Sequence, residues 1–191
     1  MADLFEQSLK RELDSVDKVR KVSFAITMCE RMVPALDKFS KESDFDNSIY
    51  HASLDCAWDY LKTREISCKC NKMIEECLGY APDTDEFNHP LTSAALNAAL
   101  SIAATVSFLA DDYVDHIVEI AGLARDTAAL CAQTADAKPP RSLGYDEIIQ
   151  HPLVLHELGK QAEDLQFVKA LPTEYLQADQ LISLLKERTR T

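Results

Sequence analysis

Apolar residues recur at every third or fourth position through most of this chain, a spacing that places them on one face of an α-helix. Stripes of this kind run from Val16 to Met32, from Tyr50 to Leu61 and from Ile66 to Leu78. Ser15 is a suitable N-cap for the first helix, and Pro34, which lacks a backbone N–H, is expected to break or restart it. No segment alternates as a β-strand would, so the pattern predicts helices only.

Turns are expected where polar residues, Gly and Pro gather between these stripes. Asp44–Asn47 and Pro82–Pro90 have this composition, and Gly79 is expected to end the helix before the second of them. A later helix should run to about Ala135. Ala137–Gly144, which contains two prolines, is the clearest linker. Three more helices are expected beyond it, around residues 145–150, 158–168 and 175–185.

The segment Leu91–Ala110 contains no charged residue and is expected to form the central helix. Its twenty residues could span a membrane, but seven are Ala and only seven are large and apolar, so its hydrophobicity is too weak. Ala95, Ala99, Ala103 and Ser107 form a stripe at four-residue spacing, which lets neighbouring helices approach closely. A buried helix is therefore predicted.

These elements predict an all-α fold, a single compact domain of about seven to nine helices around the buried Ala-rich helix. Its 191 residues are enough for one such domain. Within 1–191, residues 1–136 are expected to form the main bundle, 137–144 a linker, and 145–191 helices that pack on the bundle.

The charge is unevenly distributed. The chain has a net charge of −12, and Met73–Ala124 contains nine acidic residues and no Lys or Arg. These acidic residues flank the uncharged helix, which would be about 30 Å long at 1.5 Å per residue, so the group at 83–86 and the group at 111–119 should lie toward its opposite ends. Such a balance opposes binding to nucleic acid or to anionic membranes and favours a basic protein partner.

The sequence lacks the motifs of several classes of binding site and enzyme. The four glycines are far apart, so no phosphate-binding loop is present, and no cofactor is predicted. Hydrolase signatures such as Gly-x-Ser-x-Gly and His-Glu-x-x-His are missing. Because Met1–Leu13 lacks the features of a signal peptide, a cytoplasmic location is expected, where the six cysteines should be buried thiols.

The most chemical-looking cluster surrounds the end of the uncharged helix. On a helix, Asp112, His116 and Glu119 would share one face and could offer oxygen and nitrogen ligands to a metal. Asp111, Asp112 and Asp115 are equally suited to capping the next helix, where acidic residues are favoured by the helix dipole. The chain contains no Glu-x-x-His motif of a dimetal bundle, and this favours a capped, solvated face over a metal site.

Glu30 and Arg31 are unusual because they lie inside an otherwise apolar stripe. If they are partly buried they should pair with opposite charges, since an unpaired buried charge is costly. A structural ion pair is the favoured interpretation, and a functional polar pair in a cleft is the alternative.

The block Cys29-Glu30-Arg31-Met32-x-Pro34, followed by Trp58, resembles the bacterial family of unknown function that includes the enterobacterial protein YjaG. Asp85-Glu86-Phe87 and His116-Ile117-Val118-Glu119 are also similar, and the resemblance covers about residues 16 to 135. It implies an all-helical cytosolic protein with no established activity. It also draws attention to Glu30, Arg31, His116 and Glu119 as positions that match the family pattern.

The sequence leads to three hypotheses. The first is a noncatalytic interaction module whose acidic surface binds a basic protein, in its narrowest form an immunity protein that inhibits a basic nuclease. The candidate positions for binding are the following: Glu30, Arg31, Asp83, Asp85, Glu86, Asp111, Asp112, Asp115, His116 and Glu119. The alternative is a metal-binding protein or enzyme that uses Asp112, Asp115, His116 and Glu119. A homodimer is compatible with either.

Overall fold

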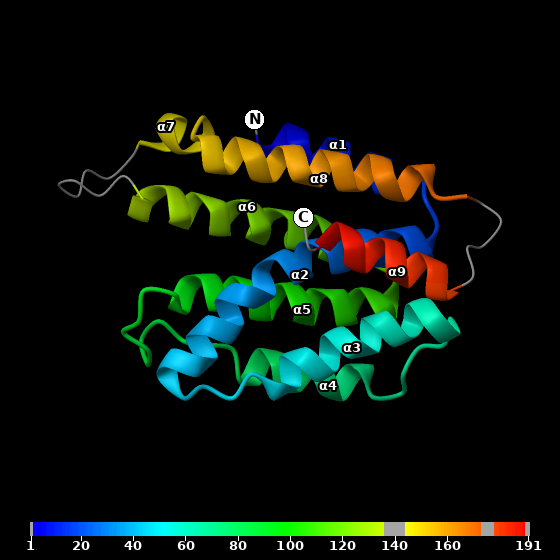
Figure 1. The fold of residues 1–191 in the computed structure, drawn as a ribbon, viewed down its shortest axis with the longest axis horizontal. Coiled ribbons are helices and arrows are strands. Elements are labelled where there is room, and N and C mark those ends of the chain that lie inside the picture. Colours follow the sequence, from blue (N-terminus) through cyan, green and yellow to red (C-terminus); the bar gives the residue numbers. More distant parts are fainter. Residues whose placement is uncertain (1, 136–143, 173–177, 190–191) are drawn as a thin grey trace.

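The computed structural model describes residues 2–135, 144–172 and 178–189, and they form helices without strands (Figure 1). This confirms the all-α fold. The helices are α1 Ala2–Asp14, α2 Lys18–Ser43, α3 Ser48–Thr63, α4 Cys70–Gly79, α5 Thr92–Asp111, α6 Asp115–Ala135, α7 Tyr145–Ile149, α8 Pro152–Ala170 and α9 Ala178–Thr189.

The uncharged segment forms α5, and α5 is the centre of the bundle. Helices α2, α3, α4 and α6 all pack on it, and α2 crosses the bundle obliquely (Figure 1). Ala95, Ala99 and Ala103 are buried, as the small-residue stripe predicts. Among the described helices α5 has the length and the mean hydropathy of a membrane span, 1.6, but 67% of that window is buried. Its apolar surface is therefore covered by its neighbours.

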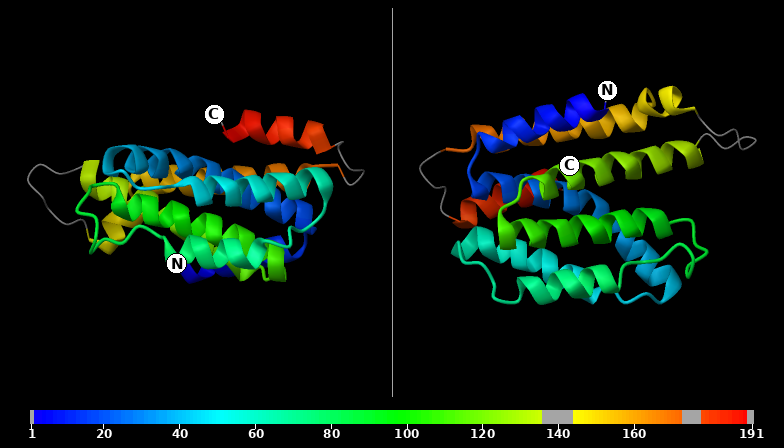
Figure 2. Two further views of the ribbon diagram at one scale, coloured as in Figure 1. Left: turned by 90° about the horizontal axis from the view of Figure 1, so that it is seen from below. Right: turned by 180° about the vertical axis from the view of Figure 1, so that it is seen from behind.

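The C-terminal helices complete the other side of the bundle. Helix α8 packs on α6 and α2, and α9 packs on α3 and α2 (Figures 1 and 2). Helix α1 lies beside α8, and Lys169 of α8 forms an ion pair with Glu12 of α1. The predicted linker falls almost entirely outside the described residues, as does Tyr175 in the predicted last helix.

Helix α2 differs from the prediction at both ends of its apolar stripe. Its N-cap is Asp17, whose carboxylate accepts the N–H of Arg20 at 2.9 Å, and Ser15 lies outside the helix. Pro34 does not break the helix, which continues to Ser43. Met32 and Leu36, on either side of Pro34, are both buried. The burial of the helical turns on both sides of Pro34 outweighs the cost of an interior proline, which is about 3 kcal/mol.

Three further expectations were wrong. Helix α4 begins at Cys70, and Ile66, which was assigned to its stripe, is 49% exposed. Asp112 does not cap α6. It is instead the left-handed C-cap of α5, at φ 61°. Cys68 and Cys131 are exposed, whereas the other four cysteines are buried as expected.

Candidate functional site

Two turns lie together at one end of the molecule, the turn after α2 and the loop before α5. Phe45 belongs to the first turn and Phe87 to the second, and their ring centroids are 5.8 Å apart. Both rings also pack on Phe39 of α2, at 5.4 and 5.2 Å. Because aromatic pairs of this geometry are favourable, the cluster holds the two turns side by side.

Hydrogen bonds fix the loop before α5. The Thr92 hydroxyl donates to the Phe87 carbonyl at 2.9 Å, and the Asp83 carboxylate accepts the N–H of Asp85 at 2.8 Å. His89 Nε2 lies 3.2 Å from a carboxylate oxygen of Glu42 on α2. The loop is therefore anchored both to α5 and to α2.

The acidic neighbours of Phe45 and Phe87 define a surface that we call the acidic end: Asp44, Asp46, Asp83, Asp85 and Glu86. All five are exposed, and none forms an ion pair with a residue in the described ranges. The backbone N–H of Ser48 lowers the pKa of Asp46. Within the described residues, none of the five carboxylates therefore has a cation as its partner.

Other exposed side chains lie close to the acidic end along the chain. Tyr80, three residues before Asp83, is 67% exposed, and Leu78 is also exposed. Lys38 and Lys41 lie on the last turns of α2 and are the nearest lysines along the chain to Asp44. The surface thus combines unpaired carboxylates with an exposed aromatic ring.

The acidic group at the other end of α5 is different, because lysines from far along the chain pair with two of its four carboxylates. Lys18 Nζ lies 3.8 Å from Asp112 Oδ1, and Lys10 Nζ lies 2.5 Å from Asp115 Oδ1. His116 Nε2 lies 3.0 Å from Asp111 Oδ2. The sequence segment 73–124 contains no Lys or Arg, but the fold brings Lys10 and Lys18 to the acidic group at 111–119.

The same geometry bears on the metal hypothesis. Asp112 ends α5 in a left-handed conformation, so it does not share a helical face with His116 and Glu119, and that part of the prediction was wrong. Within the part of the chain that the structure describes, no three His, Cys, Asp or Glu side chains are grouped to hold a metal ion. The arrangement is one of capped and paired charges.

Local contacts hold two of these carboxyl groups in the charged form. The hydrogen bonds from Lys10 and Tyr113 lower the pKa of Asp115. Partial burial raises the pKa of Asp111, but the Tyr113 N–H and His116 outweigh it, so that this pKa is also lowered. Glu119 is exposed and pairs with no described residue.

Arg31 lies in a network of charges between α2, α8 and α9. Its Nη2 lies 3.0 Å from Glu157 Oε1, its Nε donates to Glu157 Oε2 at 3.3 Å, and its Nη1 forms an ion pair with Asp164. Asp164 is only 2% exposed, and its second oxygen accepts from Arg188 Nε at 2.5 Å. The Arg31 Nη1 also donates to the Thr27 carbonyl at 3.2 Å. Ion pairs outweigh burial and raise the pKa of Arg31.

Glu30 does not pair with Arg31. Its carboxylate accepts the indole N–H of Trp58 on α3 at 2.8 Å. Glu30 and Arg31 both line a cavity of about 390 Å³ whose walls also include His156 and Lys160. Because Arg31 uses most of its donors inside the fold, the structural interpretation of Arg31 fits better than a functional pair in a cleft.

The block Cys29–Met32 is a junction of helices. The Thr105 hydroxyl donates to the Ser101 carbonyl, so the Cys29 thiol, 3.2 Å away, donates to Thr105 on α5. Met32 Sδ accepts from Ser101 at 3.8 Å. Glu30 meets α3 and Arg31 meets α8, so four consecutive residues contact three other helices. Burial raises the pKa of Cys29 to about 12, which makes it a packing residue.

Sequence reasoning missed the partners of these charges. Glu157 and Asp164 lie 126 and 133 residues from Arg31, and Lys10 lies far from Asp115 along the chain. No local pattern links such positions. The one signal was the presence of Arg31 in an apolar stripe, which requires a buried acid somewhere in the chain.

Comparisons with known proteins place the chain among uncharacterised bacterial proteins. The uncharacterised protein YjaG of Escherichia coli K12 is 23% identical over 188 residues, which cover 92% of this chain and 94% of YjaG. An uncharacterised protein of Haemophilus influenzae is 22% identical over 177 residues, covering 87% and 90% of the two chains.

A crystal structure of a DUF416 family protein from Shewanella baltica has the same fold, with a TM-score of 0.77, 20% identity and coverage of 93% of both chains. The family described as "Protein of unknown function (DUF416)" matches residues 8–191. The resemblance seen at residues 16–135 therefore extends through the C-terminal helices. This chain belongs to the DUF416 family.

Proposed function

We propose that this protein is a noncatalytic interaction module that binds a basic protein partner on its acidic end. The observation that carries the proposal is the contrast between the two ends of α5. Lys10 and Lys18 neutralise carboxylates at one end, whereas the five carboxylates of the acidic end pair with no described residue. A surface that keeps unneutralised charge attracts an oppositely charged partner and accelerates its association.

Two other features support a binding role. Tyr80, three residues before Asp83 along the chain, is an exposed aromatic side chain, and Tyr is among the residues that most often dominate the energy of protein interfaces. The Phe39, Phe45 and Phe87 cluster holds the two turns in place, so the surface is ordered before a partner arrives.

The noncatalytic part of the proposal rests on the family block. Its thiol, on Cys29, and its cation, on Arg31, are both engaged in contacts between helices. The metal-binding alternative lacks comparable support, because Asp112 and Asp115 contact lysines.

The narrowest form of the proposal is an inhibitor of the immunity type. Nucleases bind a polyanion through basic surfaces, so an acidic end that covers such a surface would compete with the nucleic acid. The homodimer stays a separate prediction. Light scattering at micromolar concentration would contradict it by returning a species of 21.4 kDa, the mass of one chain.

Affinity capture from the native host tests the proposal. The wild type is compared with a variant that carries Asp83→Asn, Asp85→Asn and Glu86→Gln. A control carries the same changes on another exposed surface, namely Asp55→Asn, Asp59→Asn and Glu65→Gln. All three proteins should have the same thermal unfolding midpoint, because these side chains are exposed.

We expect one basic protein to be recovered with the wild type and with the control, and to be lost with the acidic-end variant. Recovery should fall as the salt concentration rises, since salt screens exposed charges. Recovery of the same protein by all three, or recovery that does not depend on salt, would contradict docking at the acidic end.

A further inference from the structure

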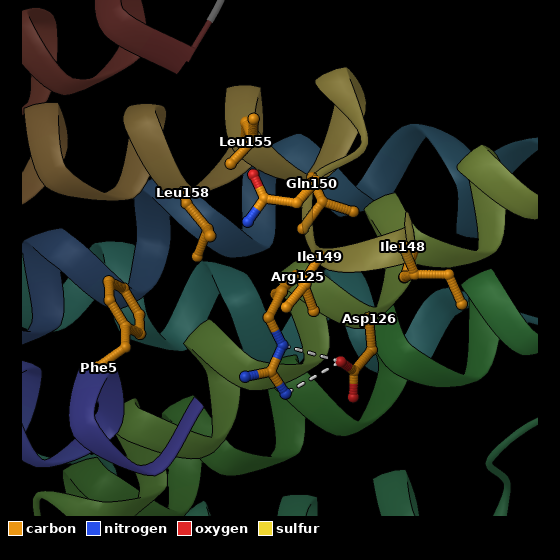
Figure 3. A pocket seen from close by; sticks show the side chains of 10 residues that line it. Phe5, Arg125, Asp126, Ile148, Ile149, Gln150, Leu155 and Leu158 are labelled. Carbon is orange, nitrogen blue, oxygen red and sulfur yellow. Dashed lines mark hydrogen bonds and ion pairs between the residues drawn. The ribbon is translucent and has the colours of Figure 1, made fainter. Parts of the chain in front are cut away.

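A second surface, separate from the acidic end, contains a cavity with apolar walls. It lies between α1, α6, α7 and α8 and has a volume of about 340 Å³ (Figure 3). Its walls are the side chains of Phe5, Ile148, Ile149, Val154, Leu155 and Leu158. Val154 is 1% exposed and Leu155 is 48% exposed, so the cavity runs from the protein interior to an open mouth. Such a volume is within the usual range for small-molecule sites, about 300–1,000 Å³.

Two charged side chains of α6, Arg125 and its ion-pair partner Asp126, line this cavity. The Arg125 Nε donates to Asp126 Oδ1 at 3.0 Å, its Nη2 lies 3.0 Å from the same oxygen, and its Nη1 donates to Glu6 Oε1 at 3.2 Å (Figure 3). A guanidinium has five N–H donors, so these contacts leave two. Burial lowers the pKa of Arg125, but the two carboxylates outweigh it and raise this pKa. Arg125 therefore stays charged and can donate to a ligand.

Gln150 supplies a further polar group. Its amide extends toward Leu155 and Leu158 and forms no hydrogen bond with another described residue (Figure 3). An amide of this kind can donate to or accept from a polar group on a ligand. The cavity thus has apolar walls and a small number of hydrogen-bonding groups, which is the usual composition of a ligand site.

The charges around Arg125 select the kind of polar group. Two carboxylates face one guanidinium, so a further anion would meet net negative charge. A cation in the cavity would lose its hydration against apolar walls, which is costly. An uncharged acceptor such as a carbonyl oxygen meets neither penalty and can use the free N–H groups.

We propose that this cavity binds an uncharged amphiphile, with its apolar body against α7 and α8 and a carbonyl oxygen at Arg125. This site is independent of the acidic end, because it involves other helices. Loss of the protein partner in the capture experiment would leave this proposal unchanged.

Prodan, an uncharged naphthalene ketone, is a suitable probe because its emission moves to shorter wavelength in apolar surroundings. Titration of the wild type should show saturable binding of one prodan per chain with this shift. Ala129→Phe places a ring in the cavity, and it should weaken binding by about tenfold or more, because overfilling removes the space. The matched control is Ala52→Phe on the exposed face of α3, which should bind prodan as the wild type does.

Three more measurements keep the test decisive. Anionic anilinonaphthalene sulfonate should bind more weakly than prodan, and Arg125→Met should weaken prodan. Methyl chemical shifts of Ile148 and Val154 in the wild type should move on addition of prodan, a readout that needs no folded variant. Equal binding by the wild type and a folded Ala129→Phe, no saturable binding, stronger binding of the anion, or unmoved methyl signals would overturn the proposal.

Discussion

Replacing Arg31 by Met tests whether the family block is a structural junction. Met keeps much of the apolar stem and removes the guanidinium, so the main change is electrostatic. In the native protein Arg31 is 23% exposed, Glu157 is 14% exposed and Asp164 is 2% exposed. The substitution leaves Glu157 without its cation, whereas Asp164 keeps Arg188.

The expected loss follows from the burial of the acids that remain. Removing one partner of a buried ion pair costs about 3–5 kcal/mol, because the other charge stays buried and uncompensated. We expect about 3 kcal/mol for Arg31→Met, the lower end of that range, since Arg188 still compensates Asp164. For a chain of this length such a loss lowers the unfolding midpoint by about 6–12 °C.

Urea unfolding followed by circular dichroism measures this free energy of unfolding directly. The matched control is Lys62→Met, which removes an ion pair of similar length, 2.9 Å, between side chains that are at least half exposed. The control should leave the unfolding midpoint unchanged.

A double-mutant cycle with Glu157→Gln should give a coupling free energy of about 1–3 kcal/mol, because the two side chains are in contact. A loss of stability below about 1 kcal/mol for Arg31→Met, together with no coupling to Glu157, would refute a structural role for Arg31, because an exposed ion pair gives results of that size.

Three other predictions concern packing, thiols and charge. Ala99→Leu should destabilise the protein by about 1–3 kcal/mol, because Ala99 is fully buried on α5 and its neighbours leave no room for a larger side chain. The control Ala110→Leu, on the exposed end of α5, should leave the stability unchanged, and thermal unfolding of both variants measures the difference. Two of the six cysteines should react rapidly with Ellman's reagent in the native protein and the other four only after unfolding, and rapid reaction of all six would contradict the burial. Lys10→Met should raise the pKa of Asp115 toward its ordinary value in an NMR titration. The stability that this carboxylate contributes above its unfolded pKa, and loses as the pH falls, should then shrink. An unchanged pKa would show that Lys10 does not act on it.

Much of the fold could be predicted because its signals are local. The uncharged composition of residues 91–110 identified α5, and the period of apolar residues identified most of the other helices. Pro34 misled the prediction because the cost of an interior proline is local, whereas the burial of Met32 and Leu36 that offsets it is tertiary. Asp112 misled it because an aspartate can cap either helix, and only the backbone conformation decides between them.

The candidate site was less predictable, because charges pair across the fold. The sequence showed nine acids in a segment without Lys or Arg, but it could not show that Lys10 and Lys18 reach the group at 111–119 and leave the acidic end. The apolar cavity was not foreseen either. Phe5, Arg125 and Leu158 come from three helices, and no local pattern links them.

Photo-crosslinking in the native host tests the central claim, docking at the acidic end, most directly. Benzoylphenylalanine replaces Tyr80 in one variant and Tyr113 in another, because both tyrosines are exposed and they lie toward opposite ends of α5. Docking at the acidic end predicts a covalent adduct with one basic protein from the Tyr80 position and none from the Tyr113 position. No adduct at Tyr80, or the same adduct at both positions, would contradict it.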